Sequence, residues 1–242
     1  MNTGRTRIIL VALAVVLVAA VTGGVLWWRG GDTPAEVSLE DAVAAASTTT
    51  TAAGAGPATT AAASTLDGTW TVRVGDGVFV GFRIDEELAG VGAKNVVGRT
   101  PGVTGSLTLT GPTITGLVIE ADLTKIETDS SQRTNALRTR GLETNTYPTA
   151  KFRQTTPLTL DAAPTPGATR KASIVGELTV HGVTKTVTVP VEAKLDADRA
   201  IVVVPPFEVR LADYGIEKPL VPGRVLSIAD VAVFEAQLQL TR

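Results

Sequence analysis

The chain has 242 residues, of which 44% are hydrophobic and 19% are charged, and its formal net charge is −2. This balance lacks the excess of basic residues that a nucleic-acid-binding surface needs. The chain contains no cysteine, which excludes disulfides, thiolate metal sites and cysteine nucleophiles.

The first predicted element follows residues 1–7 and is an uncharged run from Ile8 to Trp28. As an α-helix this run would be about 31 Å long, close to the ~30 Å hydrocarbon core of a bilayer. Two arginines precede it and two tryptophans end it, as in a retained signal anchor with a cytoplasmic N-terminus. A cleaved signal peptide is the alternative, because Ala19–Thr22 offers a weak cleavage site. We expect a single-pass membrane protein whose C-terminal part is extracytoplasmic.

Residues 29–65 predict a flexible linker. They are rich in Thr, Ala, Ser and Gly and lack the large apolar groups that offset the entropy of ordering. Ser38-Leu39-Glu40-Asp41 resembles a capping box, so one short helix is expected to continue through Ala42–Ala46.

From residue 66 to the C-terminus, apolar and polar residues alternate with a period of two, which predicts half-buried strands. The alternation is cleanest in Thr186–Leu195, where every second residue is apolar. Strands are expected at Thr69–Val74, Val78–Ile84, Val103–Thr110, Leu117–Leu123, Ala150–Thr155, Ile174–Val180, Thr186–Leu195, Ile201–Val209 and Leu226–Leu240. Asp230 interrupts the last of these and predicts a bulge or an inward polar contact.

One internal segment predicts a short helix, which Asp129 or Ser130 begins and Gly141 ends. About eight strands with one short helix favour an all-β, antiparallel barrel, because closure removes the exposed sheet edges. The predicted domain organisation is residues 1–7 cytoplasmic, 8–28 transmembrane, 29–65 linker and 66–242 barrel.

The interior of an eight-stranded barrel is either filled by side chains or holds a small ligand. The few aromatic residues and many small branched ones favour a cavity here. The residues predicted to line this lumen and contact a ligand are Phe79, Phe82, Leu107, Leu109, Leu117, Ile119, Ala121, Phe152, Leu178, Val187, Val189, Val191, Phe207, Ile228 and Phe234.

The sequence argues against an enzyme. His181 is the only histidine, so a zinc site would lack its usual nitrogen and sulfur ligands. A Ser-His-Asp triad would have to use His181, and no Gly-x-Ser-x-Gly elbow is present. A hairpin position is the favoured interpretation of His181, and no catalytic residue, metal or cofactor is predicted. The expected helix carries three arginines, Arg133, Arg138 and Arg140. The favoured interpretation is a solvated helix face, and the alternative is a contact with a phosphate headgroup.

Four segments resemble the YceI-like family, which are bacterial lipocalin-like barrels that bind polyisoprenoids. The segments are Gly68–Val72 with Val80–Phe82, Arg133–Phe152, Gly176–Lys185 and Asp213–Ile216. They occur in the family's order across residues 66–242. Asn135 and Ala136 stand where the family often has an acidic residue and a histidine, so no headgroup role is transferred to them.

Together with the expected signal anchor, the resemblance implies a membrane-tethered cell-envelope protein that holds a long apolar chain, such as an isoprenoid lipid or quinone, in its barrel. The mechanism would be the transfer of apolar surface out of water. The alternative is a ligand-free envelope module that docks a partner protein on its outer surface, for which a fully packed barrel is expected. The sequence does not identify that partner.

Overall fold

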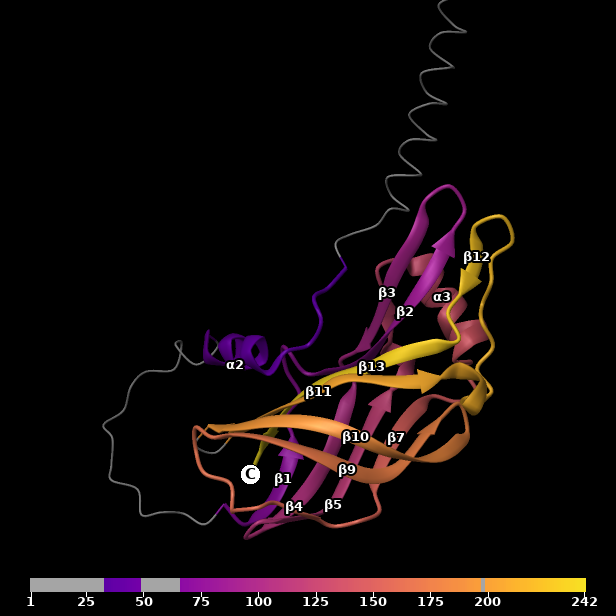
Figure 1. Cartoon of the computed structure of the whole chain (residues 1–242). Coiled ribbons are helices and arrows are strands. Elements are labelled where there is room, and N and C mark those ends of the chain that lie inside the picture. The colour runs from indigo at the N-terminus through magenta and orange to yellow at the C-terminus, as the bar shows by residue number, and fades with distance from the viewer. Residues whose placement is uncertain (1–32, 49–65, 197–198) are drawn as a thin grey trace, which may run out of the picture. The chain divides into compact units, whose positions relative to one another are not determined.

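A computed structural model describes residues 33–48, 66–196 and 199–242 (Figure 1). The expected membrane span at residues 8–28 lies outside this part of the chain, as do residues 49–65 of the expected linker. Within the described ranges, none of the helices has the length and apolar character needed to cross a bilayer.

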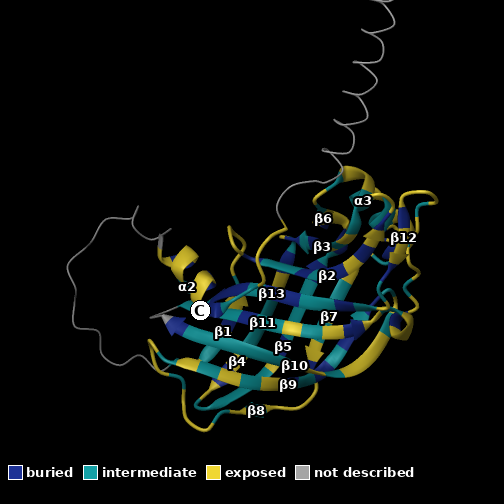
Figure 2. Ribbon diagram, turned by 45° about the horizontal axis from the view of Figure 1, so that its top comes forward, coloured by how far each residue is buried: buried dark blue, intermediate teal, exposed yellow. Residues whose placement is uncertain are grey.

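The described residues confirm the expected antiparallel barrel. Eight strands form a closed ring in the order β1, β4, β5, β7, β9, β10, β11 and β13, and β13 pairs with β1 to complete it. Their bounds are β1 Gly68–Val72, β4 Val103–Thr110, β5 Thr113–Asp122, β7 Thr149–Gln154, β9 Thr169–Val180, β10 Val183–Asp196, β11 Arg199–Arg210 and β13 Val231–Thr241. Burial alternates along these strands, as the bands of colour in Figure 2 show, so one face of each lines the interior.

Strands β2 (Phe79–Leu88) and β3 (Gly92–Thr100) extend the sheet beside the ring. β2 pairs with the first half of β13, and β3 pairs with both β2 and the short β6 (Glu127–Thr128). The sequence prediction missed β3. Its polar and glycine-rich residues carry no clear alternation, and its strand conformation is stabilised by pairing with β2 along its whole length.

The C-terminal strand expected at residues 226–240 is instead two strands, and this part of the prediction was wrong. β12 (Val225–Ile228) pairs with β2, and β13 begins only at Val231. Asp230 lies between them, where its carbonyl accepts a hydrogen bond from the Leu211 amide at 2.9 Å. Leu226, which the alternation placed on the inner face, is 58% exposed.

The predicted internal helix is present. α3 (Ser131–Ala136) continues directly into a π-helical turn, η3 (Leu137–Gly141). Two 3₁₀ turns, η2 (Leu123–Lys125) and η4 (Leu211–Tyr214), follow β5 and β11. These turns place buried residues at the same end of the barrel as η3, because Leu123, Leu142 and Tyr214 belong to one core cluster.

The N-terminal segment also carries the predicted short helix, α2 (Leu39–Thr48). Ser38 begins it, since its hydroxyl accepts a hydrogen bond from the Asp41 amide at 3.1 Å. The described residues from Pro34 onward form one compact unit, in which α2 packs on the outer face of β11. Ile201 and Val203 of β11 are each only 1% exposed because α2 covers them. This part of the expected linker therefore contacts the barrel wall.

A buried group of charges joins the same segment to the barrel. Glu235 of β13 accepts a hydrogen bond from Arg83 at 2.8 Å and lies 2.6 Å from the guanidinium of Arg99. Both arginines also donate to the carbonyl oxygen of Ala35. The Glu235 side chain is 2% exposed and that of Arg83 is 7% exposed, so these charges are stabilised by each other rather than by water.

The ladder between β10 and β11 covers only one end of these strands, and they separate beyond it (Figure 1). Pairing runs from Asp196↔Arg199 to Glu192↔Val203 and then stops. Pro190 follows on one strand, and Pro205 and Pro206 follow on the other. Proline has no N–H to donate to a ladder, which explains where this pairing ends.

Candidate ligand-binding site

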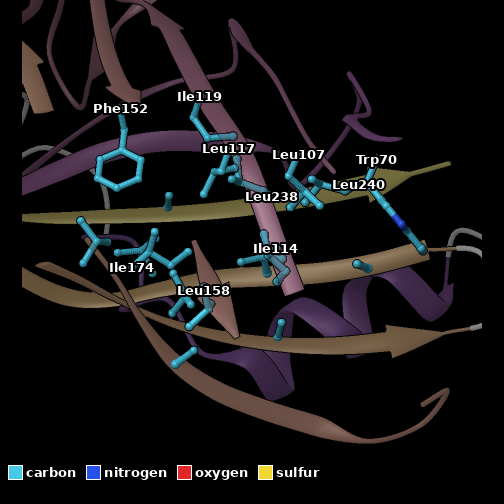
Figure 3. Close-up of a pocket in the computed structure, with 18 of the residues that line it drawn as sticks. Trp70, Leu107, Ile114, Leu117, Ile119, Phe152, Leu158, Ile174, Leu238 and Leu240 are labelled. Carbon is cyan, nitrogen blue, oxygen red and sulfur yellow. The ribbon is translucent and has the colours of Figure 1, made fainter. Parts of the chain in front are cut away.

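The barrel interior contains a cavity of about 240 Å³ with an almost wholly apolar wall. Every strand of the ring contributes inward residues to it, including Leu107 of β4, Ile119 of β5 and Leu238 of β13, whose side chains are seen together in Figure 3. The volume exceeds the ~150 Å³ of an apolar cavity that binds benzene, and lies just below the ~300–1,000 Å³ typical of drug-sized ligands. The cavity therefore suits a segment of an apolar chain.

Trp70 contributes the largest side chain of the cavity wall, and its one polar atom, the indole Nε1, is hydrogen-bonded within the protein. Its indole Nε1 donates to the carbonyl oxygen of Leu66 at 3.0 Å. Buried indole N–H groups need such a partner. The ring is thus held by its polar edge, and it lines the cavity together with Leu107, its partner across β1 and β4.

One end of the barrel interior is filled by an aromatic plug, which we define as Phe82, Phe152, Phe207 and Phe234 with the buried residues of η2, η3 and η4 around them. Two glycines make room for two of these rings. A Cβ on Gly176 would lie 2.5 Å from Phe152, and one on Gly98 would lie 2.6 Å from Phe82. The plug closes the barrel at the helical end, so the cavity occupies the other half.

The opposite end is crossed by the connection between β7 and β9, residues 155–168, which we call the strap. Its two-residue strand β8 (Leu158–Thr159) pairs with the start of β5. Further along, the Gly167 amide donates to the carbonyl of Leu195 at 2.7 Å. The strap residues that line the cavity are Leu158, Leu160, Pro164 and Ala168.

Gln154 holds the start of the strap in place. Its side-chain oxygen accepts a hydrogen bond from the Leu117 amide at 3.1 Å, and its Nε2 donates to the carbonyls of Ile114 and Thr156. Gly116, with a φ of 64°, lets β5 bulge between these contacts. Because of that bulge, Ile114 and Leu117 both face the cavity although they are three residues apart.

Most of the residues predicted to line the lumen do line this cavity. They are Leu107, Leu109, Leu117, Ile119, Ala121, Phe152, Leu178, Val189, Val191, Phe207 and Phe234. Strand parity placed them correctly, since each belongs to the apolar row of a regular strand. Whether they contact a ligand remains a prediction.

Four predicted residues lie elsewhere. Phe79 is on the outer face, where the guanidinium of Arg99 lies 4.1 Å from its ring centre. Phe79 and Phe82 are three residues apart on one strand, so they cannot face the same side. Phe82 and Val187 point inward but pack in the plug. Ile228 is buried on β12, which lies outside the ring and pairs with β2.

The prediction also missed part of the wall. The apolar residues that it omitted are Trp70, Val80, Ile114, Ala150, Leu158, Leu160, Pro164, Ala168, Ala172, Ile174, Ala193, Leu195, Ala200, Val202, Val204, Ala236, Leu238 and Leu240. Many of these share the parity of predicted strands and were available from the same alternation. The strap residues have no such signal, because a loop's contacts depend on the tertiary fold.

Three charged residues border the cavity. Lys151 pairs with Glu120 at 3.6 Å, and Glu235 pairs with Arg83 and Arg99. Arg170, on the inner face of β9, forms no ion pair within the described part of the chain. Among the described residues, none of these three groups lies within hydrogen-bond reach of a second carboxylate or of a nucleophile paired with a base.

Two of the three helix arginines do not lie on a solvated face, which corrects the favoured interpretation for Arg133 and Arg138. The Arg133 side chain is 9% exposed and pairs with Glu86 at 3.2 Å and with Asp129. Arg138 donates two hydrogen bonds to the carbonyl of Ile126. Arg140 remains exposed, and its guanidinium lies 3.5 Å from the carbonyl oxygen of Leu220. Arg133 and Arg138 thus form ion pairs and hydrogen bonds within the protein at the closed end of the barrel.

Burial and neighbouring charges shift the pKa values of the two carboxyl groups that contact Arg133, Glu86 and Asp129. Desolvation raises the pKa of Glu86 above its ordinary value, and the charge of Arg133 offsets this only in part. Desolvation acts on Asp129 in the same direction, but the hydrogen bond from Lys94 and the charges of Arg133 and Lys94 outweigh it and lower the pKa of Asp129. Each cation in this cluster is therefore engaged by a protein carboxylate.

His181 occupies the predicted hairpin turn, between β9 and β10, with a φ of 51°. Its Nε2 lies 2.8 Å from a carboxylate oxygen of Glu143 and its Nδ1 lies 3.2 Å from the carbonyl oxygen of Tyr214. The ring also packs on Tyr147. These contacts join three loops and lie away from the cavity wall. Among residues 33–48, 66–196 and 199–242, no group of three or more histidines and carboxylates is placed to hold a metal ion.

Comparison with known proteins identifies a family and a fold. A model described as the YceI-like domain matches residues 70–240. A polyisoprenoid-binding domain from Saccharophagus degradans, implicated in plant cell wall breakdown, superposes with a TM-score of 0.57 at 18% identity, covering 71% of this chain and 97% of that one. BcnA from Burkholderia cenocepacia superposes with a TM-score of 0.53 at 15% identity, covering 69% and 98%. No curated protein sequence matches the chain. At these identities the structural likeness shows the fold alone.

Proposed function

The chain belongs to the YceI-like domain family, and from this premise we propose that its barrel binds the apolar chain of a lipid, such as a polyisoprenoid. The observation that carries the proposal is the cavity of about 240 Å³ with its almost wholly apolar wall. Apolar surface buried there would contribute about 25 cal/mol per Å² to binding. A structural relative described as a polyisoprenoid-binding domain is consistent with this ligand class.

The size of the cavity defines how such a lipid binds. Since about 240 Å³ is below the usual range for a whole drug-sized ligand, the barrel holds a terminal segment of a long chain. The remainder of the lipid, including its polar end, then lies on the strap side of the cavity. The alternative, a ligand-free docking module, predicts a fully packed interior, which the cavity does not favour.

The proposal includes a membrane tether and an extracytoplasmic barrel. It is supported by the uncharged run Ile8–Trp28, with arginines before it and tryptophans at its end. Protease added to intact cells should remove the barrel and leave the N-terminus protected. A mature protein that begins near Thr22 and is free in the extracellular fraction would contradict the tether.

Replacing Val189 with aspartate tests the ligand directly. Val189 lines the cavity, so an unpaired carboxylate there would cost several kcal/mol and reduce apolar binding at least tenfold. The assay is the displacement of an apolar naphthylamine fluorophore from the full chain in phosphatidylcholine nanodiscs. Thr188→Asp adds the same charge on the neighbouring, exposed residue and should bind as the unmodified chain does. Equal affinities for the two folded variants would refute binding in the lumen.

A further inference from the structure

Arg170 stands out among the charged residues around the cavity. Lys151 and Glu235 are engaged by oppositely charged neighbours, with contacts of 3.6 Å to Glu120 and 2.8 Å to Arg83. Arg170 has no such partner within the described part of the chain. Its guanidinium therefore keeps all its donors for water or for a ligand.

The strand places Arg170 at the strap end of the cavity. Residues 170, 172, 174 and 178 of β9 all line the cavity, and Arg170 comes first, directly after the strap. It pairs across the sheet with Ala193, close to the end of β10. Arg170 is half-buried. An arginine in this setting lays its aliphatic stem along the apolar wall and keeps its guanidinium at the rim.

The arginines of α3 and η3, at the closed end of the barrel, do not line the cavity. Arg133 and Lys94, which lie near the plug, are both paired with protein carboxylates. A ligand's charged group also cannot enter the apolar cavity without a large desolvation cost. A charged head must therefore stay at the strap end, where Arg170 is the wall residue able to neutralise it.

We infer that the site binds a single-chain amphiphile with an anionic head, a carboxylate or a phosphate, whose tail occupies the cavity and whose head meets Arg170. The inference rests on the proposed lipid-binding function and adds the class of headgroup and a limit on the chain, which must be short enough for its head to lie at Arg170 while its tail occupies the cavity. A guanidinium is suited to this role because its planar fork donates paired hydrogen bonds to carboxylate and phosphate oxygens.

The test compares two ligands that share a tail. Dodecyl phosphate and dodecanol displace the apolar fluorophore from the full chain in phosphatidylcholine nanodiscs. The unmodified chain should bind the phosphate about tenfold more tightly than the alcohol, the lower range for charge-assisted hydrogen bonds at a partly exposed site. Arg170→Gln should reduce this ratio to about one, and Arg170→Lys should keep part of it. Partition into the nanodisc is the same for every variant, so it cancels when ratios are compared.

Lys171→Gln is the matched control. It removes one positive charge from the adjacent residue, which is on the outer face, is 73% exposed and pairs with Glu192. The control should keep the full preference for the phosphate. The preference of the unmodified chain should also shrink in about 1 M salt, where the Debye length is about 3 Å. Inorganic phosphate alone should not displace the fluorophore.

Several outcomes would overturn the inference. The unmodified chain could bind both ligands equally, or the preference for dodecyl phosphate could persist in Arg170→Gln. Lys171→Gln could lose that preference to the same extent as Arg170→Gln. Inorganic phosphate alone could displace the fluorophore, which would indicate a free-anion site. Failure of the proposed function looks different, because then neither dodecyl phosphate nor dodecanol displaces the fluorophore from the unmodified chain.

Discussion

Replacing Glu235 with alanine is expected to lower the free energy of unfolding by about 3–5 kcal/mol, the usual cost of removing one partner from a buried ion pair. Glu235 is the carboxylate that lies between Arg83 and Arg99, at 2.8 and 2.6 Å. Without it, two guanidinium groups face each other, and that of Arg83 has almost no access to water. Urea unfolding followed by Trp70 fluorescence measures the loss, with Trp27 and Trp28 replaced by phenylalanine in every variant.

Glu208→Ala is the control for this prediction. Glu208 is an exposed carboxylate on β11, and its removal should change the free energy of unfolding by at most about 0.5 kcal/mol. The double variant Glu235→Leu, Arg83→Met should recover part of the loss, because apolar side chains of similar size often replace a buried ion pair at little cost. Equal effects of Glu235→Ala and Glu208→Ala would contradict the stabilising role of this charge group.

The regular parts of the barrel were readable from the sequence because alternation reports which face of a strand is buried. β10 shows this best. Val189 and Val191 line the cavity, as predicted, and so do Ala193 and Leu195 in the same row. Phe79 shows that a large apolar side chain does not by itself identify the inner face of a strand. Its ring lies on the outer face, where Arg99 covers it.

The rest of the site depends on contacts between segments far apart in the chain. The strap carries no periodic pattern, and its place over the barrel end depends on Gln154 and on the hydrogen bond from Gly167 to Leu195. The burial of Arg133 depends on Glu86, which lies 47 residues earlier. Likewise, α2 was predicted from its capping residues, but the packing of this helix on Ile201 and Val203 has no local signal.

The structure gives an equally strong expectation for the ligand. If the cavity holds the end of a lipid chain, full-length protein purified from its native host should retain a lipid tightly enough to survive removal of bulk lipid. Ala172→Phe should abolish that retention. Ala172 lines the cavity on β9, so the added ring occupies the space of the ligand. Folding should be preserved, because filling a cavity adds contacts that the ligand-free core lacks.

Ser173→Phe is the matched control, because it adds the same ring one residue away on the exposed face of β9. It should retain lipid as the unmodified chain does. This comparison also guards against lipid that merely adheres to the apolar run Ile8–Trp28, which is identical in all three proteins.

Mass spectrometry of the extracted lipid, quantified per mole of protein for these three chains, tests the central claim most directly. We expect close to one chain lipid per unmodified protein and per Ser173→Phe protein, and none specific to Ala172→Phe. The same lipid content in all three folded proteins, or none in any of them, would contradict lipid binding in the barrel.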